Sequence, residues 1–217
     1  LLGRIRHVFD LSARPDLIAA QLRKDARLQP LLDAKPGLRV PGAYDGFELA
    51  VRAILGQQVT VRAATTLACR FVETFGAPVA TPFPQLTRLS PTPEQVAQAR
   101  AEDIAALGIV GARARSILAL AQACRCGALR LEAGAHPAAL IQQLVQLPGI
   151  GAWTAHYIAM RALRWPDAFP KEDIALRHAL GGVTPAQAEA LSQAWRPWRS
   201  YAVLHLWRGL PTKEPKE

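Results

Sequence analysis

A short turn, LPGIG at residues 147–151, lies between two segments that have the apolar periodicity of helices. Two glycines two residues apart let the backbone turn tightly and bring bare N–H groups close to a large anion, because neither residue carries a Cβ. The helix that follows begins with N–H groups that have no intrahelical partner, at the positive end of the helix dipole. A nucleic-acid phosphate is therefore the predicted ligand of Gly149, Gly151 and the hydroxyl of Thr154.

The same turn has a simpler interpretation, because Pro-Gly-x-Gly commonly separates two helices without binding anything. The charge of the chain favours the phosphate. Its net charge is +9 at pH 7 and its pI is about 10.2, and 21 of its 26 basic residues are arginine, which suits bidentate phosphate contacts. This balance predicts a polyanionic partner. The alternative is a compositional bias toward arginine, with Arg113, Arg115 and Arg125 forming a solvated helix face.

The length and cysteine content exclude several classes of protein. With 217 residues, half of them hydrophobic, the chain is long enough to bury a core as one or two domains. Three cysteines, at positions 69, 124 and 126, are too few for a disulfide framework and indicate a reducing compartment. No apolar run approaches the length of a membrane span, and no secretory signal is present. We expect a cytoplasmic protein without membrane association, and the start at Leu1 suggests a piece of a longer chain.

Helical patterns dominate the sequence and predict an all-α fold. The expected helices cover residues 15–32, 45–56, 60–76, 92–107, 111–127, 137–146, 152–164, 172–181, 185–194 and 199–209. Capping patterns with an amide or acid three residues later begin at Asp45, Thr92 and Thr184. Left-handed closing glycines are expected at positions 76, 127 and 209. Only residues 1–11 and 38–41 show any period-two character.

Four separated motifs in the same order carry a resemblance that covers nearly the whole chain. They are VRAILGQQVTV at 51–61, LPGIGAWTAHYIAMRAL at 147–163, AFPKEDIALR at 168–177 and AWRPWRSYAVLHLW at 194–207. Together they resemble the helix-hairpin-helix DNA glycosylases, and more narrowly the AlkA-like 3-methyladenine DNA glycosylase II family. The resemblance implies two helical subdomains with an active-site cleft between them. It also implies that the N-terminal β domain of the best-known members would lie before this chain.

The resemblance further implies a division of the chain into three segments. Residues 1–45 would pack with the C-terminal subdomain, residues 46–165 would form a helical barrel-like subdomain containing the hairpin, and residues 166–217 would form the C-terminal subdomain with the catalytic residue.

Asp173 matches the catalytic aspartate of the family. Cleavage of an N-glycosidic bond builds positive charge on the sugar, and a fixed carboxylate near that carbon stabilises it and orients the attacking water. Glu172 is its neighbour, but adjacent helical positions point about 100° apart, so only one of the two would face the cleft. From the residues alone, an ordinary helix cap is the simpler interpretation of Asp173.

The remaining site residues follow from the same resemblance. Trp153, Tyr157 and Trp207 match base-pocket positions, and an electron-rich ring attracts a purine made cationic by alkylation. Core packing is the alternative for any aromatic residue at helical spacing, and we expect it for Trp195 and Trp198.

Two further elements complete the predicted site. Gln58 corresponds to the side chain that fills the gap left by a flipped base, with Gln57 beside it near the lesion. The backbone carbonyls of Val145, Leu147 and Ile150 are the candidate ligands of an optional monovalent cation.

We therefore expect a monofunctional DNA glycosylase that flips alkylated purines, of the 3-methyladenine and 7-methylguanine type, out of duplex DNA in base excision repair. Trp153 stands where lyase-active relatives have a lysine, so no Schiff base is expected. No cofactor is required, and the four-cysteine iron–sulfur motif of some relatives is absent. The expected partner is duplex DNA, bound by a monomer. The alternatives are a non-catalytic DNA-binding module of a fusion protein and a glycosylase for a deaminated or oxidised base.

Overall fold

The computed structural model describes residues 1–132 and 134–210, and in these residues the backbone is helical, with no β-strand and one isolated antiparallel bridge between Pro78 and Arg88. The all-α prediction is confirmed. None of the helices in this part of the chain is long and apolar enough to span a lipid bilayer.

The helices group into two compact units, residues 1–44 with 159–217, and residues 45–158. In the first unit they are α1 (Leu2–Val8), α2 (Pro15–Leu22), α3 (Gln29–Ala34), α11 (Ile174–Ala179), α12 (Pro185–Ser192), the short 3-10 helix η1 (Gln193–Trp195) and α13 (Arg199–Gly209). In the second they are α4 (Gly46–Leu55), α5 (Val61–Phe75), α6 (Pro93–Val96), α7 (Ala101–Ala105), α8 (Gly111–Arg125) and α9 (Pro137–Leu144). The remaining helix, α10 (Ala152–Ala162), contains the boundary at residues 158 and 159.

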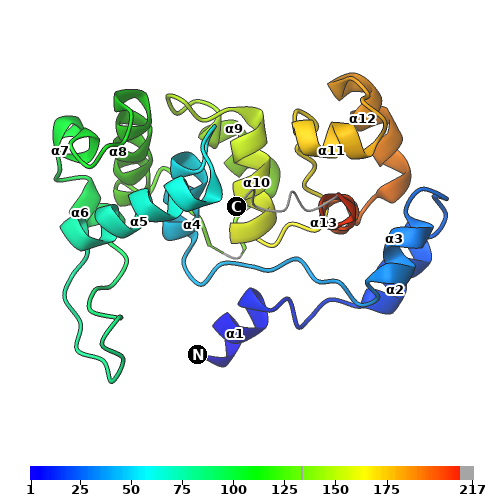
Figure 1. Cartoon of the computed structure of the whole chain (residues 1–217), viewed down its shortest axis with the longest axis horizontal. Helices are drawn as coiled ribbons and strands as arrows, with labels where there is room; N and C mark the ends of the chain where they lie inside the picture. The colour runs from blue at the N-terminus through cyan, green and yellow to red at the C-terminus, as the bar shows by residue number, and fades with distance from the viewer. Residues whose placement is uncertain (133, 211–217) are drawn as a thin grey trace, which may run out of the picture. The chain divides into compact units, whose positions relative to one another are not determined.

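The second unit is built around α8. This helix packs against α4, α6 and α7, and Figure 1 shows α7 beside it. Ile117 and Leu120 of α8 are fully buried, as are Ile54 of α4 and Ile104 of α7. The apolar faces of these helices thus provide the core of the unit, and the polar faces remain on the surface.

The first unit is built around α13, which contacts α3 and α11. Trp195 is fully buried and packs edge-on against Phe169, with ring centroids 6.0 Å apart. Trp198 lies partly buried against the same core, so the prediction of core packing for Trp195 and Trp198 is confirmed. The indole of Trp195 donates to Asp25 Oδ2 at 2.8 Å. Together with the dominant Arg27 contact, this bond lowers the pKa of Asp25 to about 2.

A buried polar cluster joins the N-terminal residues to α13. The hydroxyl of Tyr201 donates to Asp10 Oδ2 at 2.7 Å, the amide of Val40 donates to the same oxygen at 3.3 Å, and Arg164 lies 3.6 Å from Asp10 Oδ1. Burial, followed by the contact with Asp10, raises the pKa of Tyr201 well above its usual range. Residues separated by up to 191 positions are therefore held together by one carboxylate.

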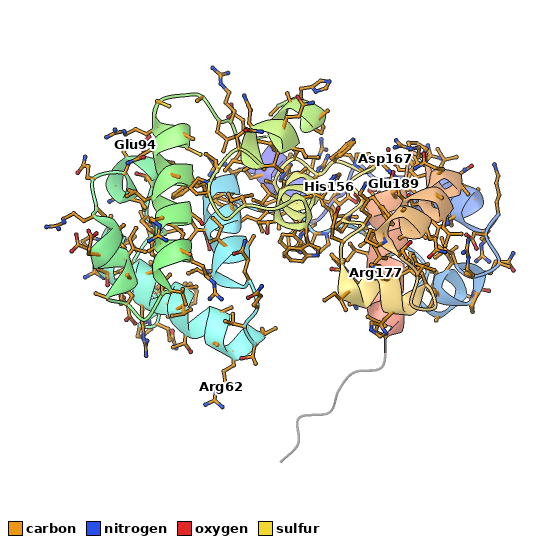
Figure 2. The ribbon with its side chains drawn as sticks, turned by 90° about the horizontal axis from the view of Figure 1, so that it is seen from above. Arg62, Glu94, His156, Asp167, Arg177 and Glu189 are labelled. Carbon is orange, nitrogen blue, oxygen red and sulfur yellow. The ribbon has the colours of Figure 1, made fainter. Side chains whose placement is uncertain are left out.

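A second buried cluster lies between Asp167 and α13. The guanidinium of Arg199 donates to both carboxylate oxygens of Asp167, at 2.8 and 3.0 Å, and also reaches Glu189 Oε1 at 3.0 Å. Arg196 donates to Asp167 as well. Figure 2 shows the labelled side chains of Asp167 and Glu189 close together in this unit. Because Arg199 and Asp167 are almost fully buried, each depends on the other for its hydrogen bonds.

Local signals predicted several helix starts and missed some breaks. Asp45 and the capping boxes at Thr92 and Thr184 are confirmed. Two predicted helices are wrong as single elements. Residues 15–32 divide into α2 and α3 because Pro30 starts a new helix, and residues 92–107 divide into α6 and α7 because Asp103 accepts the amide of Arg100.

Two further expectations are corrected. Residues 1–11, which showed period-two character, contain helix α1 (Leu2–Val8), because apolar residues recur at positions 1, 2, 5, 8 and 9, which is helical spacing. Of the three expected left-handed glycines, only Gly127 has a positive φ, of 74°. Gly76 has a φ of −76°, and Gly209 is the last residue of α13. The division of the chain into three segments, with a boundary at residues 165 and 166, stays a prediction; the two compact units divide at residues 158 and 159.

Candidate functional site

The turn at residues 145–151 joins α9 to α10 and forms a helical hairpin in the second unit. Gly149 has a φ of 72°, in the left-handed region that favours glycine, and the amide of Ile150 closes the turn by donating to Leu147 O at 3.2 Å. The side chain of Ile150 is buried and anchors the turn to the unit. The two helices are therefore connected by a rigid reversal, with Gly151 exposed at its end.

The two glycines of the turn have different structural environments. A Cβ at Gly149 would lie 2.3 Å from Ser116 Oγ of α8, whereas a Cβ at Gly151 meets no atom within 4 Å. Ser116 is itself buried and donates to Ala112 O at 3.0 Å. The close approach of Ser116, together with the positive φ, thus explains why a glycine occupies position 149. Among the residues that the structure describes, no atom excludes a side chain at Gly151, and the contact of Gly151 with a phosphate stays a prediction.

This difference yields a prediction for the hairpin. Gly149→Ala should lower the free energy of unfolding by about 1–3 kcal/mol, because of the positive φ and the contact with Ser116. Gly151→Leu should change that free energy by less than about 1 kcal/mol but weaken binding to every duplex roughly tenfold, because it blocks hydrogen bonds to a charged phosphate. Urea unfolding and duplex titration of both variants would measure the two effects. Unchanged DNA affinity in the Gly151→Leu variant would refute the phosphate contact.

Gln57 connects the end of α4 to the hairpin. Its side-chain amide donates to Gly149 O and to Thr154 Oγ1, both at 3.1 Å. Thr154 is only 3% exposed, so its hydroxyl is engaged inside the unit, an arrangement that the sequence pattern did not indicate. The contact of Thr154 with phosphate stays a prediction, as does the position of Gln57 near a lesion. What the structure adds is a link between the hairpin and the loop that carries Gln58.

Gln58 occupies the tip of the loop between α4 and α5. It is exposed and has a φ of 52°, a left-handed conformation that a non-glycine residue adopts at a cost of about 1–3 kcal/mol. Two apolar neighbours are also exposed, Val59 at 36% and Val61 at 84%. Side chains that insert into a base stack are usually apolar, and here the polar Gln58 is flanked by two exposed valines, so its insertion stays a prediction. The valines are visible in the sequence, but their exposure is not.

Trp153 and Tyr157 lie one turn apart on α10. Their rings are stacked, with centroids 5.4 Å apart and planes inclined by 10°. Both are partly buried. The spacing of four residues places the two rings on one face of the helix, whereas their function in a base pocket stays a prediction.

Asp173 is the N-cap of α11 in the first unit. Its Oδ1 accepts the amide of Leu176 at 2.6 Å and the indole Nε1–H of Trp207 at 3.3 Å, and the residue is 8% exposed. The capping role that the sequence left open is therefore real, and it holds the carboxylate in a defined orientation. The structure brings Asp173 and Trp207 together across 34 positions of sequence.

The residue before Asp173 is a second carboxylate. Glu172 is partly buried, and its Oε2 is the one buried side-chain oxygen that accepts no hydrogen bond within the described ranges. The two neighbouring carboxylates thus differ in environment. Asp173 has a cap and an indole as partners, whereas one oxygen of Glu172 has none.

The carbonyls of Val145, Leu147 and Ile150 as ligands of a monovalent cation stay a prediction. Val145 is the C-cap of α9, where backbone carbonyls lack intrahelical partners at the negative end of the helix dipole. Leu147 O accepts one hydrogen bond, from Ile150, and keeps a second lone pair. Elsewhere in the described part of the chain, no group of three or more His, Cys, Asp or Glu side chains is placed to hold a metal ion.

Burial raises the pKa of the Cys124 thiol to about 12, which leaves it protonated at neutral pH.

The geometry thus contains two groups of predicted residues. In the second unit, Gln57 contacts both Gly149 and Thr154. In the first unit, Asp173 contacts Trp207. Sequence reasoning missed Ser116, whose place beneath Gly149 comes from the packing of α8.

Comparison with known proteins adds independent support. The model of the HhH-GPD superfamily of base excision DNA repair proteins matches residues 51–199, and the model of the AlkA N-terminal domain matches residues 1–45. DNA-3-methyladenine glycosylase 2 of Escherichia coli (strain K12) is 37% identical over 206 residues, which cover 95% of this chain and 70% of that protein.

A longer relative covers the same region. The probable bifunctional transcriptional activator/DNA repair enzyme AlkA of Mycobacterium tuberculosis (strain CDC 1551 / Oshkosh) is 44% identical over 212 residues. These cover 96% of this chain, which spans only 42% of the length of that relative.

A solved structure has the same arrangement of helices. The 3-methyladenine DNA glycosylase of Archaeoglobus fulgidus superposes with a TM-score of 0.79 at 22% identity, over 95% of this chain and 73% of that one. The fold of that structure is therefore the fold of this chain.

Proposed function

The chain belongs to the HhH-GPD superfamily of base excision DNA repair proteins, and from this membership we propose that it is a monofunctional DNA glycosylase for alkylated purines. The observation that carries the proposal is the contact between Asp173 and Trp207, which sets a nearly buried carboxylate beside an aromatic ring. A structural cap needs only the amide of Leu176. The added indole supports a site for a charged aromatic ligand.

The proposed reaction is hydrolysis of the N-glycosidic bond. As that bond breaks, positive charge develops on the sugar ring, and the fixed negative charge of Asp173 stabilises it. The same carboxylate orients the attacking water and accepts its proton. Orientation is supplied by the bonds from Leu176 and Trp207 to Oδ1, which cost no reorganisation during the reaction.

The proposed substrates are purines made cationic by methylation at a ring nitrogen. An aromatic face attracts a cation by about 0.5–2 kcal/mol beyond ordinary stacking. We assign this task to Trp207 and to the stacked pair Trp153 and Tyr157. In the family resemblance, the position of Trp153 carries a lysine in enzymes with lyase activity, and without an amine nucleophile the product is an abasic site.

The remaining predicted residues act on the duplex. Gly149 and Gly151 present backbone amides to a phosphate, and Gln58 fills the space that the flipped base leaves. The carbonyls of Val145, Leu147 and Ile150 would hold a monovalent cation, which would add positive charge beside that phosphate. We place the action of the protein on DNA in the bacterial cytoplasm, as a monomer without a required cofactor.

The test is release of free bases from duplex DNA. Duplexes containing 7-methylguanine or 3-methyladenine should lose the modified base, while matched duplexes containing hypoxanthine should react more slowly, because a neutral base gains less from the aromatic faces. Preferred release of the deaminated base would support the alternative glycosylase. Binding without release of any base would support a DNA-binding module.

Trp207 permits a separate prediction about selectivity. Trp207→Ala should reduce the preference for methylated over neutral purines by about two- to thirtyfold, since the cation loses an aromatic face. Trp207→Phe keeps a ring but removes the hydrogen bond to Asp173, so it should retain most of the preference. Competing single-turnover rates on the two duplexes measure this ratio. Equal loss of preference in both variants would show that the hydrogen bond, and not the ring, sets the selectivity.

A further inference from the structure

An open hollow of about 520 Å³ lies in the second unit, where α5 and α8 both begin. Three arginines line it, Arg62 and Arg70 from α5 and Arg113 from α8, and no carboxylate is among its lining residues. Figure 2 shows the labelled Arg62 extending away from the ribbon of α5. We call this feature the arginine hollow.

The charges of the arginine hollow are largely uncompensated. Arg62 and Arg113 have no ion pair or side-chain hydrogen bond with any residue that the structure describes, and Arg70 donates only to the carbonyl of Leu107, at 3.1 Å. Other arginines of the same unit are paired, such as Arg52 with Glu48 at 2.8 Å. Three like charges around one hollow repel each other, and a bound anion would relieve this repulsion.

The position of the hollow connects it to the predicted DNA-binding residues. Val59 and Thr60, which follow Gln58 directly, also line it. On its other side, α8 carries Ser116, which lies beneath Gly149 of the hairpin. The first turn of α8 has no side-chain cap at Val110, so its amides add to the positive potential. The hollow is thus continuous with both the Gln58 loop and the helix that supports the hairpin.

We propose that the arginine hollow binds the phosphodiester backbone of duplex DNA, as a contact separate from the hairpin. The inference rests on the proposed function, because it takes duplex DNA as the partner. Arginine suits phosphate because its planar guanidinium donates two parallel hydrogen bonds to one anion. A second contact point fixes the orientation of the duplex against the Gln58 loop, which a single phosphate held by the hairpin leaves free to rotate.

The experiment compares two double variants of equal charge. Arg62→Gln with Arg113→Gln removes two cations from the hollow. Arg125→Gln with Arg130→Gln removes two exposed cations elsewhere in the unit, and Arg125 lies 12 residues, about 18 Å, along α8 from Arg113. Affinity for an undamaged duplex is measured over a series of salt concentrations. Log affinity falls as log salt rises, and each lost phosphate contact makes this negative slope less steep by about 0.9.

In the hollow variant the negative slope should become less steep by about 1.8, and in the control variant it should stay nearly unchanged. Equal reductions in both variants would show a general charge effect and overturn the proposal, as would no reduction in either. Duplexes with single neutral methylphosphonates, placed in turn on each strand, add a second readout. At one or more positions the neutral linkage should weaken binding of the wild-type protein but not of the hollow variant.

Base release by the wild-type protein, measured on a methylated version of the same duplex, tests the proposed function independently. If the wild-type protein released no base but the hollow variant showed the expected reduction in salt dependence, the glycosylase proposal would be refuted and the hollow would remain a DNA contact. Normal release with an unchanged slope would refute the hollow alone.

Discussion

Asp173→Asn should lower the single-turnover rate of base release by about 10²–10³-fold, because it removes the charge that stabilises the developing sugar cation. Asparagine caps a helix as well as aspartate does, so the bond to the amide of Leu176 and the stability of α11 should persist. Duplex affinity should be equal or slightly higher, since a negative charge near phosphates is removed. The loss is therefore specific to chemistry, and the measurement is release of 7-methylguanine under protein excess.

Two companion variants separate the functions of this carboxylate. Asp173→Ala removes charge and cap together and should cost about 1 kcal/mol of stability beyond the effect on the rate. Glu172→Gln removes the neighbouring charge while keeping the size of the side chain, and most of the rate should remain. An Asp173→Asn protein that releases bases at close to the wild-type rate would leave Asp173 as a helix cap only. A large loss in Glu172→Gln would move the catalytic assignment to Glu172.

Asp167→Ala should lower the free energy of unfolding by about 3–5 kcal/mol, because it leaves the buried guanidinium of Arg199 without its main partner. Glu189 remains, but it contacts Arg199 through a single oxygen and is more exposed. Urea unfolding followed by tryptophan fluorescence measures the change. Four of the five tryptophans, at positions 165, 195, 198 and 207, belong to the unit that contains Asp167, so the signal reports mainly on that unit.

An exposed ion pair provides the matched control for Asp167→Ala. Asp33 pairs with Arg23 at 2.5 Å, but both side chains are about half exposed, and Asp33→Ala should therefore cost less than about 1 kcal/mol. The double variant Asp167→Ala with Arg199→Met should recover part of the lost stability, because no charge then remains buried at that position. If Asp167→Ala cost no more than Asp33→Ala, the buried cluster would contribute little to the fold.

Much of the site was accessible from local patterns. The hairpin turn was visible in its glycines, and the starts of α4, α6 and α12 in a capping oxygen three residues before its partner. The shared face of Trp153 and Tyr157 follows from their spacing of four residues on one helix. Two breaks were missed. The break between α2 and α3 lies where Pro30 starts a new helix without a side-chain cap, and the break between α6 and α7 lies where Asp103 accepts the amide of Arg100 in competition with a continuing helix.

Local sequence patterns could not predict contacts between residues that are far apart in the sequence. The bonds of Gln57 to Gly149 and Thr154 span more than 90 positions, and the bond between Trp207 and Asp173 spans 34. Equally, the sequence shows the three arginines at positions 62, 70 and 113 but does not show that they line one hollow.

The all-α class, the positions of the hairpin and of the capped helices, and the basic charge were readable from the sequence, and the resemblance of its motifs to a family indicated Asp173. The hairpin and the capped helices depend on residues within a few positions of each other, where backbone geometry sets which side chains meet. The tertiary structure alone decided that Thr154 is buried, that Gly149 is required by Ser116, and that unpaired arginines surround a hollow beside Gln58. Those properties depend on how distant helices pack, because burial and pairing belong to the assembled core and not to any single segment.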